Sequence, residues 1–184
     1  MRKLQLFLII LFVLVFVGTI LAFYFSFSTK YKDIIKENIV DMNEEITVNL
    51  VLSIIKQESK FDKNAKSNKD AFGLMQLTFL TAKEQAEKLD MEISINDLYV
   101  PEINIKLGVN YLNYLFGIFG DKQLVLLSYN AGLGNVNKWL ENNEIYKKNG
   151  VYVTPFKESN NYLRCVLQNE KIYNIINRWK WKNY

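Results

Sequence analysis

The stretch VLSIIKQES, residues 51–59, places a carboxylate on the same side of a helix as apolar residues. Val51, Ile54, Ile55 and Glu58 follow the i, i+3, i+4, i+7 spacing of one helical face. A carboxylate that continues an apolar stripe loses solvation, which raises its pKa and lets it hold a proton near neutral pH. A general acid needs that property. The spacing leaves one alternative open, in which Glu58 lies at a frayed helix end and reaches water.

The composition excludes several other kinds of catalytic chemistry. The 184 residues include no His, so neither a Ser-His-Asp or Cys-His pair nor a His-based zinc site can form within the chain. Cys165 is the one cysteine and is interpreted as a small buried residue of a helix. Carboxylates, Lys, Tyr and Ser remain, and carboxylates are the usual groups of glycoside cleavage. We expect no metal and no cofactor.

The balance of residue types predicts an all-α domain. Hydrophobic residues make up 49% of the chain, while Gly occurs 8 times and Pro twice, which favours helices over a turn-rich β fold. The net charge of +4 suits an anionic cell-envelope polymer or a membrane surface, although ordinary solvated lysines explain it equally well. No compact basic block with interleaved aromatics is present, so nucleic acid is not an expected partner.

The N-terminal segment predicts a membrane anchor over residues 4–27. No charged residue lies between Lys3 and Lys30, and residues 6–25 alone supply 20 predominantly apolar residues, about the length that crosses a bilayer core as a helix. Arg2 and Lys3 favour a cytoplasmic N-terminus, which predicts a single-pass protein of the cytoplasmic membrane with its domain outside. Cleavage near Ser26 or Ser28 followed by secretion is the alternative.

The elements that must position Glu58 follow in order after the anchor. Residues 1–3 are predicted as a short cytoplasmic end, 28–45 as a juxtamembrane linker with a first helix, and 46–184 as one helical domain. Asp121 is a plausible cap of a helix, and Gly132 and Gly134 are expected to break the chain after it. Helices are predicted over 31–43, about 43–59, about 73–89, 101–119, 122–131 and 135–140, and from about 156 onward. A polar loop is predicted over 60–70 and an irregular segment over 144–155.

Four short motifs occur in a fixed order along the domain: ES at Glu58 and Ser59, GLMQ at residues 73–76, SYNAG at 128–132 and TPFKESNNYL at 154–163. Together they resemble the catalytic domain of lytic transglycosylases, the soluble-lytic-transglycosylase type related to goose-type lysozyme. The resemblance covers nearly everything beyond the anchor and implies a lysozyme-like helical domain. Two departures stand out, because family members often carry Met-Pro where this chain has Thr78 and Phe79, and Ala where it has Ser128.

The resemblance also implies roles for individual residues. Glu58 takes the place of the single catalytic acid, and the Tyr129 hydroxyl is expected to approach it. The implied substrate is the peptidoglycan glycan strand, cleaved at the β-1,4 bond between N-acetylmuramic acid and N-acetylglucosamine with closure of a 1,6-anhydromuramoyl ring. The expected substrate-binding residues are Ser67, Met75, Gln76, Tyr129, Asn130, Glu158 and Tyr162.

A single carboxylate must then serve as acid and as base. Glu58 is expected to protonate the leaving oxygen while the N-acetyl group of the substrate assists, and afterwards to deprotonate the C6 hydroxyl that closes the ring. One alternative is a lysozyme-type hydrolase on the same fold. Another is a membrane-anchored protein that binds glycan or assembles with envelope machinery without turnover.

Overall fold

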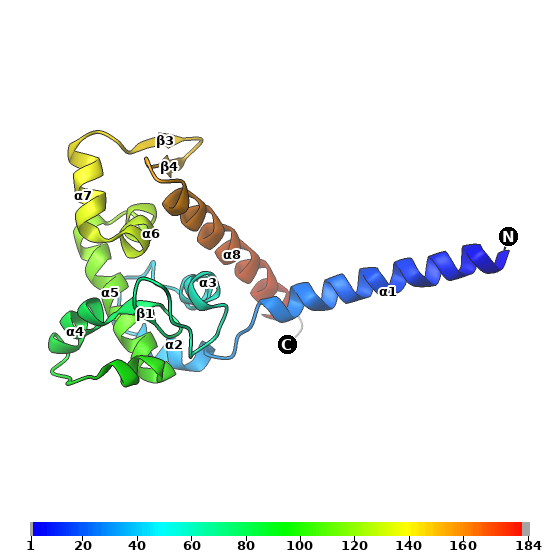
Figure 1. Cartoon of the computed structure of the whole chain (residues 1–184), viewed down its shortest axis with the longest axis horizontal. Coiled ribbons are helices and arrows are strands. Elements are labelled where there is room, and N and C mark those ends of the chain that lie inside the picture. Colours follow the sequence, from blue (N-terminus) through cyan, green and yellow to red (C-terminus); the bar gives the residue numbers. More distant parts are fainter. Residues whose placement is uncertain (1, 182–184) are drawn as a thin grey trace.

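The computed structural model describes the backbone of residues 2–181 and the side chains of residues 4–19 and 26–178. Figure 1 shows a compact body of helices from which one long helix projects. The elements in chain order are α1 (Arg2–Ser26), α2 (Lys32–Asn38), α3 (Val48–Ser59), β1 (Ala71–Phe72), β2 (Leu77–Thr78), α4 (Phe79–Glu87), the 3-10 helix η1 (Ile95–Tyr99), α5 (Pro101–Phe119), α6 (Lys122–Ala131), α7 (Leu133–Glu141), β3 (Tyr146–Lys148), β4 (Val151–Val153) and α8 (Lys157–Trp181).

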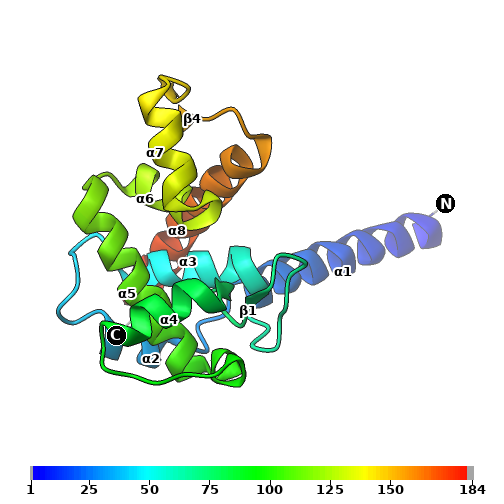
Figure 2. The same cartoon turned by 60° about the vertical axis from the view of Figure 1, so that its left-hand side comes forward.

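Helix α3 lies inside the body, where α8 and α2 pack against it (Figure 2). The Thr47 side chain caps its first turn by accepting from the Leu50 N–H over 3.1 Å. The helix begins at Val48, about five residues later than the start predicted near residue 43. Lys60, in left-handed conformation with φ 52°, ends the helix. Glu58 therefore sits in the last turn of a buried helix. The residues of α3 with no exposed surface are Leu50, Val51, Leu52, Ser53, Ile54 and Ile55.

The GLMQ motif forms a hairpin turn, so the prediction of a helix starting near Gly73 is wrong. Strands β1 and β2 pair in antiparallel fashion on either side of the motif, and Gly73 and Gln76 have φ values of 74° and 48°. A right-handed helix cannot continue through these left-handed positions. Helix α4 begins only at Phe79, where the Thr78 side chain caps it by accepting from the Thr81 N–H.

The two helices that follow agree with their predicted bounds. Helix α5 starts with Pro101 and ends at Gly120, which has φ 60°, as the Pro-start and Gly-stop pattern indicates. The Asp121 carboxylate caps α6 by accepting from the N–H groups of Gln123 and Leu124. Gly132, with φ 88°, separates α6 from α7, whereas Gly134 lies inside α7.

The segment predicted as irregular over 144–155 contains a second hairpin. Strands β3 and β4 pair in antiparallel fashion, with Asn149 and Gly150 at positive φ between them. An Asn-Gly pair between two short strands is a strong hairpin signal, which the sequence interpretation overlooked. The hairpin is tied to α6, because the Gln123 side chain donates to the Gly150 carbonyl and accepts from the Tyr152 N–H.

Residues directly after α1 pack into the same core as the helices of the domain. Phe27 and Tyr31 are 8% and 3% exposed, and Phe27 meets the buried ring of Tyr173 edge-on with centroids 5.1 Å apart. The Lys56 ammonium donates to the Ser26 carbonyl over 2.6 Å and lies over the Phe27 ring. Ser26 and Phe27, the last two residues of the segment predicted as the anchor, thus contact the helix that carries Glu58, and Tyr31 of the predicted linker is buried in the core.

Helix α1 is 25 residues long, and its described side chains at 4–19 are exposed. The anchor predicted over 4–27 includes side chains at 20–25, which lie outside the described residues. Among the residues that are described, no helix combines the length and the apolar character that a membrane crossing requires.

Candidate active site

Glu58 lines the wall of a cleft, and the rest of its side chain is covered by protein. Its side chain is partly buried, at the C-terminal end of α3. Burial raises the pKa of the Glu58 carboxyl to about 7, and the Tyr162 side chain opposes this shift by hydrogen bonding that lowers the pKa. The prediction that the apolar face raises this pKa is confirmed, and the alternative of a solvated, frayed helix end is wrong. A carboxyl with this pKa exchanges a proton readily at neutral pH.

Two tyrosines lie beside the Glu58 carboxylate and differ in their bonding. The Tyr129 hydroxyl donates to the Met75 carbonyl oxygen over 2.8 Å. The Tyr162 hydroxyl is buried and, among the described residues, forms no hydrogen bond with ordinary distance and angle. Its proton is therefore available to the Glu58 carboxylate, whose pKa Tyr162 lowers. Tyr129 interacts with Glu58 electrostatically, but its hydroxyl donates its hydrogen bond to the Met75 carbonyl and not to the acid.

The side chain of Met75 belongs to the core, so its predicted contact with a sugar face is wrong. Met75 has no exposed surface, and its thioether fills the space left by Gly108 on α5, where any Cβ would collide with it. Its main chain still shapes the site. The Met75 N–H donates to the Asn104 side chain over 2.8 Å, while its carbonyl accepts from Tyr129.

The Asn104 side chain stabilises the GLMQ turn by hydrogen bonds to its backbone and to neighbouring backbone groups, a role that the sequence interpretation missed. This fully buried amide on α5 donates to the carbonyls of Phe72 and Leu98 and accepts from Met75. Gly73 is packed against it so closely that a Cβ there would collide with the Leu98 carbonyl and the Asn104 amide. An Asn one turn before Gly108 on a helix with an apolar face was the available signal. The ES serine, Ser59, adds a bond to the Leu74 carbonyl over 2.8 Å.

The predicted residues Ser67, Gln76 and Asn130 line the cleft together with Glu58. Ser67 accepts from the N–H groups of Lys69 and Ala71, which leaves its hydroxyl proton available to a ligand. The Gln76 amide nitrogen donates to the carbonyls of Ala65 and Gly73, so its oxygen is the atom offered to a ligand. We call this space the Glu58 cleft; its volume is about 320 Å³ and its lining consists of Glu58, Ser67, Asn68, Lys69, Ala71, Gln76, Thr78, Tyr129, Asn130 and Glu158.

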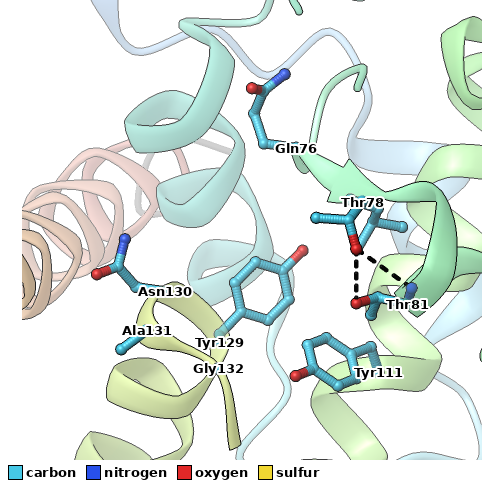
Figure 3. Close-up of a pocket in the computed structure, with 9 residues that line it drawn as sticks. Gln76, Thr78, Thr81, Tyr111, Tyr129, Asn130, Ala131 and Gly132 are labelled. Atoms are coloured by element: carbon cyan, nitrogen blue, oxygen red, sulfur yellow. Dashed lines mark hydrogen bonds between the residues drawn. The ribbon is translucent and has the colours of Figure 1, made fainter. Parts of the chain in front are cut away.

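A second hollow of about 220 Å³ shares four of these residues and extends the cleft. Figure 3 shows the Tyr129 ring between Asn130 and the pair Thr78 and Thr81, whose hydroxyls bond over 3.0 Å. Tyr111 packs against Tyr129 on the same wall. We call this space the hydroxyl hollow; its lining consists of Gln76, Leu77, Thr78, Thr81, Tyr111, Tyr129, Asn130, Ala131 and Gly132. Together the two spaces form a groove rich in hydroxyl and amide groups.

Glu158 differs from Glu58 although both line the cleft. It lies in the first turn of α8, is 72% exposed and pairs with the Lys69 ammonium over 3.2 Å. This pair joins the 60–70 loop to α8 across the cleft. Within the described residues, no cluster of three Cys, Asp or Glu side chains is arranged to hold a metal ion. The arrangement therefore offers one proton-exchanging carboxyl, a neighbouring tyrosine hydroxyl and a groove that matches a neutral, hydroxylated polymer.

A mostly helical domain with one partly buried glutamate at a polar groove is the arrangement of the lysozyme-like class of folds. The model of the transglycosylase SLT domain family matches residues 38–151. The chain belongs to this family. Helix α8, which contributes Tyr162 and Glu158, lies beyond the matched residues.

Individual relatives agree with this assignment. The soluble lytic murein transglycosylase of Escherichia coli K12 is 32% identical over 152 residues, 80% of this chain and 23% of that protein. The membrane-bound lytic murein transglycosylase C of Haemophilus influenzae PittGG is 32% identical and matches 71% of this chain and 43% of its own length. The chain thus spans about a quarter of the E. coli protein's length.

Solved structures show the same fold. The 70 kDa soluble lytic transglycosylase of E. coli superposes with a TM-score of 0.71 at 28% identity, covering 82% of this chain and 25% of that one. A lytic transglycosylase of Pseudomonas aeruginosa, in a variant described as inactive with one glutamate replaced by glutamine, gives 0.70 at 30% identity, over 83% and 25%. The lysozyme-like helical fold predicted from the sequence is confirmed.

Proposed function

We propose that the chain cleaves the β-1,4 bond between N-acetylmuramic acid and N-acetylglucosamine in peptidoglycan and forms a 1,6-anhydromuramoyl product. One observation carries the proposal: the single partly buried carboxyl of the cleft, Glu58, has a pKa raised to about 7. A group with that pKa donates a proton to the leaving oxygen and accepts one from the C6 hydroxyl at the same pH.

The Tyr162 hydroxyl supports the second half of this cycle. After Glu58 has lost its proton, the carboxylate lies in a desolvated site and needs a donor. Tyr162 supplies that donor, while Tyr129 stays bonded to Met75 and keeps the GLMQ turn in place. The N-acetyl group of the substrate assists at the anomeric carbon, since Glu158 is exposed and already paired with Lys69.

Product mass tests the proposal against hydrolysis on the same fold. The full chain, kept in detergent, is incubated with purified peptidoglycan and the released fragments are weighed by mass spectrometry. We expect muramoyl ends lighter by one water than the products of a hydrolase. Hydrated ends would assign the chain to the hydrolase alternative, and bound glycan without any released fragment would assign it to the non-catalytic alternative.

We also propose that the segment 4–27 anchors the protein in the cytoplasmic membrane with the domain outside, its last two residues, Ser26 and Phe27, packing against the domain. The uncharged run between Lys3 and Lys30 supports this, as does a relative named as membrane-bound. Protease added to intact spheroplasts should digest the domain. Digestion only after lysis would place the domain inside, and recovery of the chain in the washed soluble fraction would contradict the anchor.

A further inference from the structure

The C-terminal end of α1 is joined to the domain without a free linker. The Lys56 ammonium on α3 donates to the Ser26 carbonyl over 2.6 Å. The next residue, Phe27, is 8% exposed and packs edge-on against Tyr173 of α8. The Tyr173 hydroxyl in turn donates to the Ser28 carbonyl over 2.9 Å. Each of residues 26–28 is therefore held by α3 or α8, so no flexible segment separates α1 from the domain.

The turn of α3 that contacts α1 is also the turn that carries the acid. Lys56 and Glu58 are two positions apart on this helix, and residues at that spacing do not face each other. Lys56 reaches the end of α1, whereas Glu58 lines the cleft on the other side of the helix. Because a helix with its side chains is ~10–12 Å across, the Glu58 carboxyl lies roughly 10–15 Å from the Ser26 carbonyl. Figure 2 shows the end of α1 beside α3.

The length of α1 sets where this end lies in the proposed membrane orientation. Its 25 residues extend ~37 Å, while the hydrocarbon core of a bilayer is ~30 Å thick. A helix that crosses the core thus ends among the lipid headgroups on the outer side. Figure 1 shows α1 leading away from the body, which lies beyond the C-terminal end of the helix. Glu58 is then held roughly 10–15 Å from the headgroup layer.

A flexible linker would have given the cleft a wide range of heights above the membrane. A Gly- and Ser-rich segment of 20 residues, for comparison, has an end-to-end distance of ~25 Å. The contacts of Ser26, Phe27 and Ser28 remove that freedom. Only a glycan strand that lies close to the membrane surface can therefore enter the Glu58 cleft.

We propose that the substrate of this chain is the glycan strand at the membrane surface, with one end still linked to a membrane lipid, and not the strands of the wall farther out. The reaction that supplies this substrate is glycosyl transfer at the membrane, which elongates a lipid-linked glycan. This inference rests on the proposed function and the proposed anchor, because it specifies which strands the same cleft cleaves.

Energy transfer measures the height of the cleft without reference to catalysis. Asn68 is exposed and lines the cleft, so Asn68→Cys in a Cys165→Ala background carries a fluorescent donor. The labelled full-length chain is placed in vesicles whose lipid headgroups carry the acceptor. A second chain has 20 Gly and Ser residues inserted between residues 25 and 26, which leaves the contacts of residues 26–28 intact. The matched control carries the same segment ahead of residue 1.

We expect the insertion to lower the energy transfer at least about 2-fold, since it adds ~25 Å of flexible chain between the membrane and the domain. The control should match the chain without an insertion. Equal transfer in all three chains would show that residues 26–28 do not set the height of the cleft, which would overturn the inference.

Binding to wall fragments tests which strands the cleft reaches. Vesicles with Glu58→Gln, with and without the insertion, are mixed with insoluble wall fragments, and the bound vesicles are collected by sedimentation. We expect the insertion to raise binding several-fold, because most strands of a fragment lie too far from the vesicle surface for the native joint. Equal binding by the two chains would overturn the assignment of the substrate.

Cleavage by chains that retain Glu58 separates this inference from the proposed function. Lipid-linked strands are placed in the same vesicles as the protein, and wall fragments are added outside. The insertion should raise fragment release from the wall relative to release from the lipid-linked strands. An unchanged ratio of the two rates would sink the inference and leave the proposed function standing. No cleavage of either substrate, with energy transfer and binding as expected, would sink the proposed function alone.

Discussion

The Tyr129 hydroxyl donates to the Met75 carbonyl oxygen over 2.8 Å, and therefore not to Glu58. This bond makes Tyr129 a support of the GLMQ turn and leaves Tyr162 as the tyrosine that lowers the pKa of Glu58. The two hydroxyls lie near one carboxylate but have separable effects.

Replacing each tyrosine by phenylalanine should separate these effects. Glu58 must be protonated to act as the acid, so activity falls as pH rises through its pKa. Tyr162→Phe removes the donor that stabilises ionised Glu58, so this basic limb should move upward by about half a unit to one unit. Tyr129→Phe should leave the limb in place and lower stability by about 1 kcal/mol through the lost bond to Met75. The pH dependence of the rate and thermal melts of each variant check these two expectations. A shift of the basic limb of the pH–rate profile in Tyr129→Phe would show that Tyr129, and not Tyr162, is the donor to Glu58.

The raised pKa of Glu58 also predicts how stability depends on pH. The folded chain holds this proton up to about pH 7, whereas the unfolded chain releases it near the ordinary glutamate pKa of 4.5. Because the unfolded state binds fewer protons between these values, the group lowers stability as pH rises through this window. Glu58→Gln should thus be about 2–3 kcal/mol more stable than wild type at pH 8, but nearly equal to it at pH 4. Denaturant melts at the two pH values measure the difference, and a gap independent of pH would contradict the burial of the charge.

Asn104 should matter to stability far more than its polar side chain suggests. Asn104→Ala leaves the Met75 N–H and the carbonyls of Phe72 and Leu98 without their partner in the core. The expected loss is about 3 kcal/mol or more, together with loss of activity through the GLMQ turn. Asn110→Ala on the same helix is the control, since it breaks only a half-buried bond to Lys106 and should cost less than about 1 kcal/mol. Similar melting temperatures for the two variants would contradict the role of Asn104.

The residues after α1 should behave as part of the domain. Phe27→Ala removes the edge-on contact with Tyr173 and the ring below the Lys56 ammonium, at an expected cost of about 3 kcal/mol. Phe12→Ala is the matched control, because Phe12 is 70% exposed on α1 and should leave the domain's melting temperature unchanged in detergent. Removal of residues 1–28 should destabilise the domain, whereas removal of residues 1–25 should not. Equal stability of the two truncated chains would show that residues 26–28 are a passive linker.

Much of this fold follows from local signals in the sequence. Pro101 and Gly120 bound α5, and Asp121 caps α6, because each of these residues acts on the backbone next to it. Glu58 was found for a similar reason, since its spacing on the helix places it with buried neighbours.

The misassignments of the GLMQ segment and of Met75 came from distant contacts, whereas the β3–β4 hairpin had a local Asn-Gly signal that was overlooked. The pattern of GLMQLTFL reads as helical, but Asn104 binds both sides of the turn and Gly73 leaves no room for a side chain there. Met75 was assigned to the groove because nothing next to it reveals that Gly108, over thirty residues later, opens a space for its thioether. The Lys69–Glu158 pair likewise joins a loop and a helix that are remote in the chain.

Replacement of Glu58 tests the central claim most directly. Full-length wild type and Glu58→Gln are compared on purified peptidoglycan by the rate of fragment release and by sedimentation of bound protein with the insoluble wall. We expect the amide to keep the fold and the binding, while the rate falls by about 10²-fold or more because it cannot deliver a proton. Cleavage by Glu58→Gln at the wild-type rate would contradict the assignment of Glu58 as the acid.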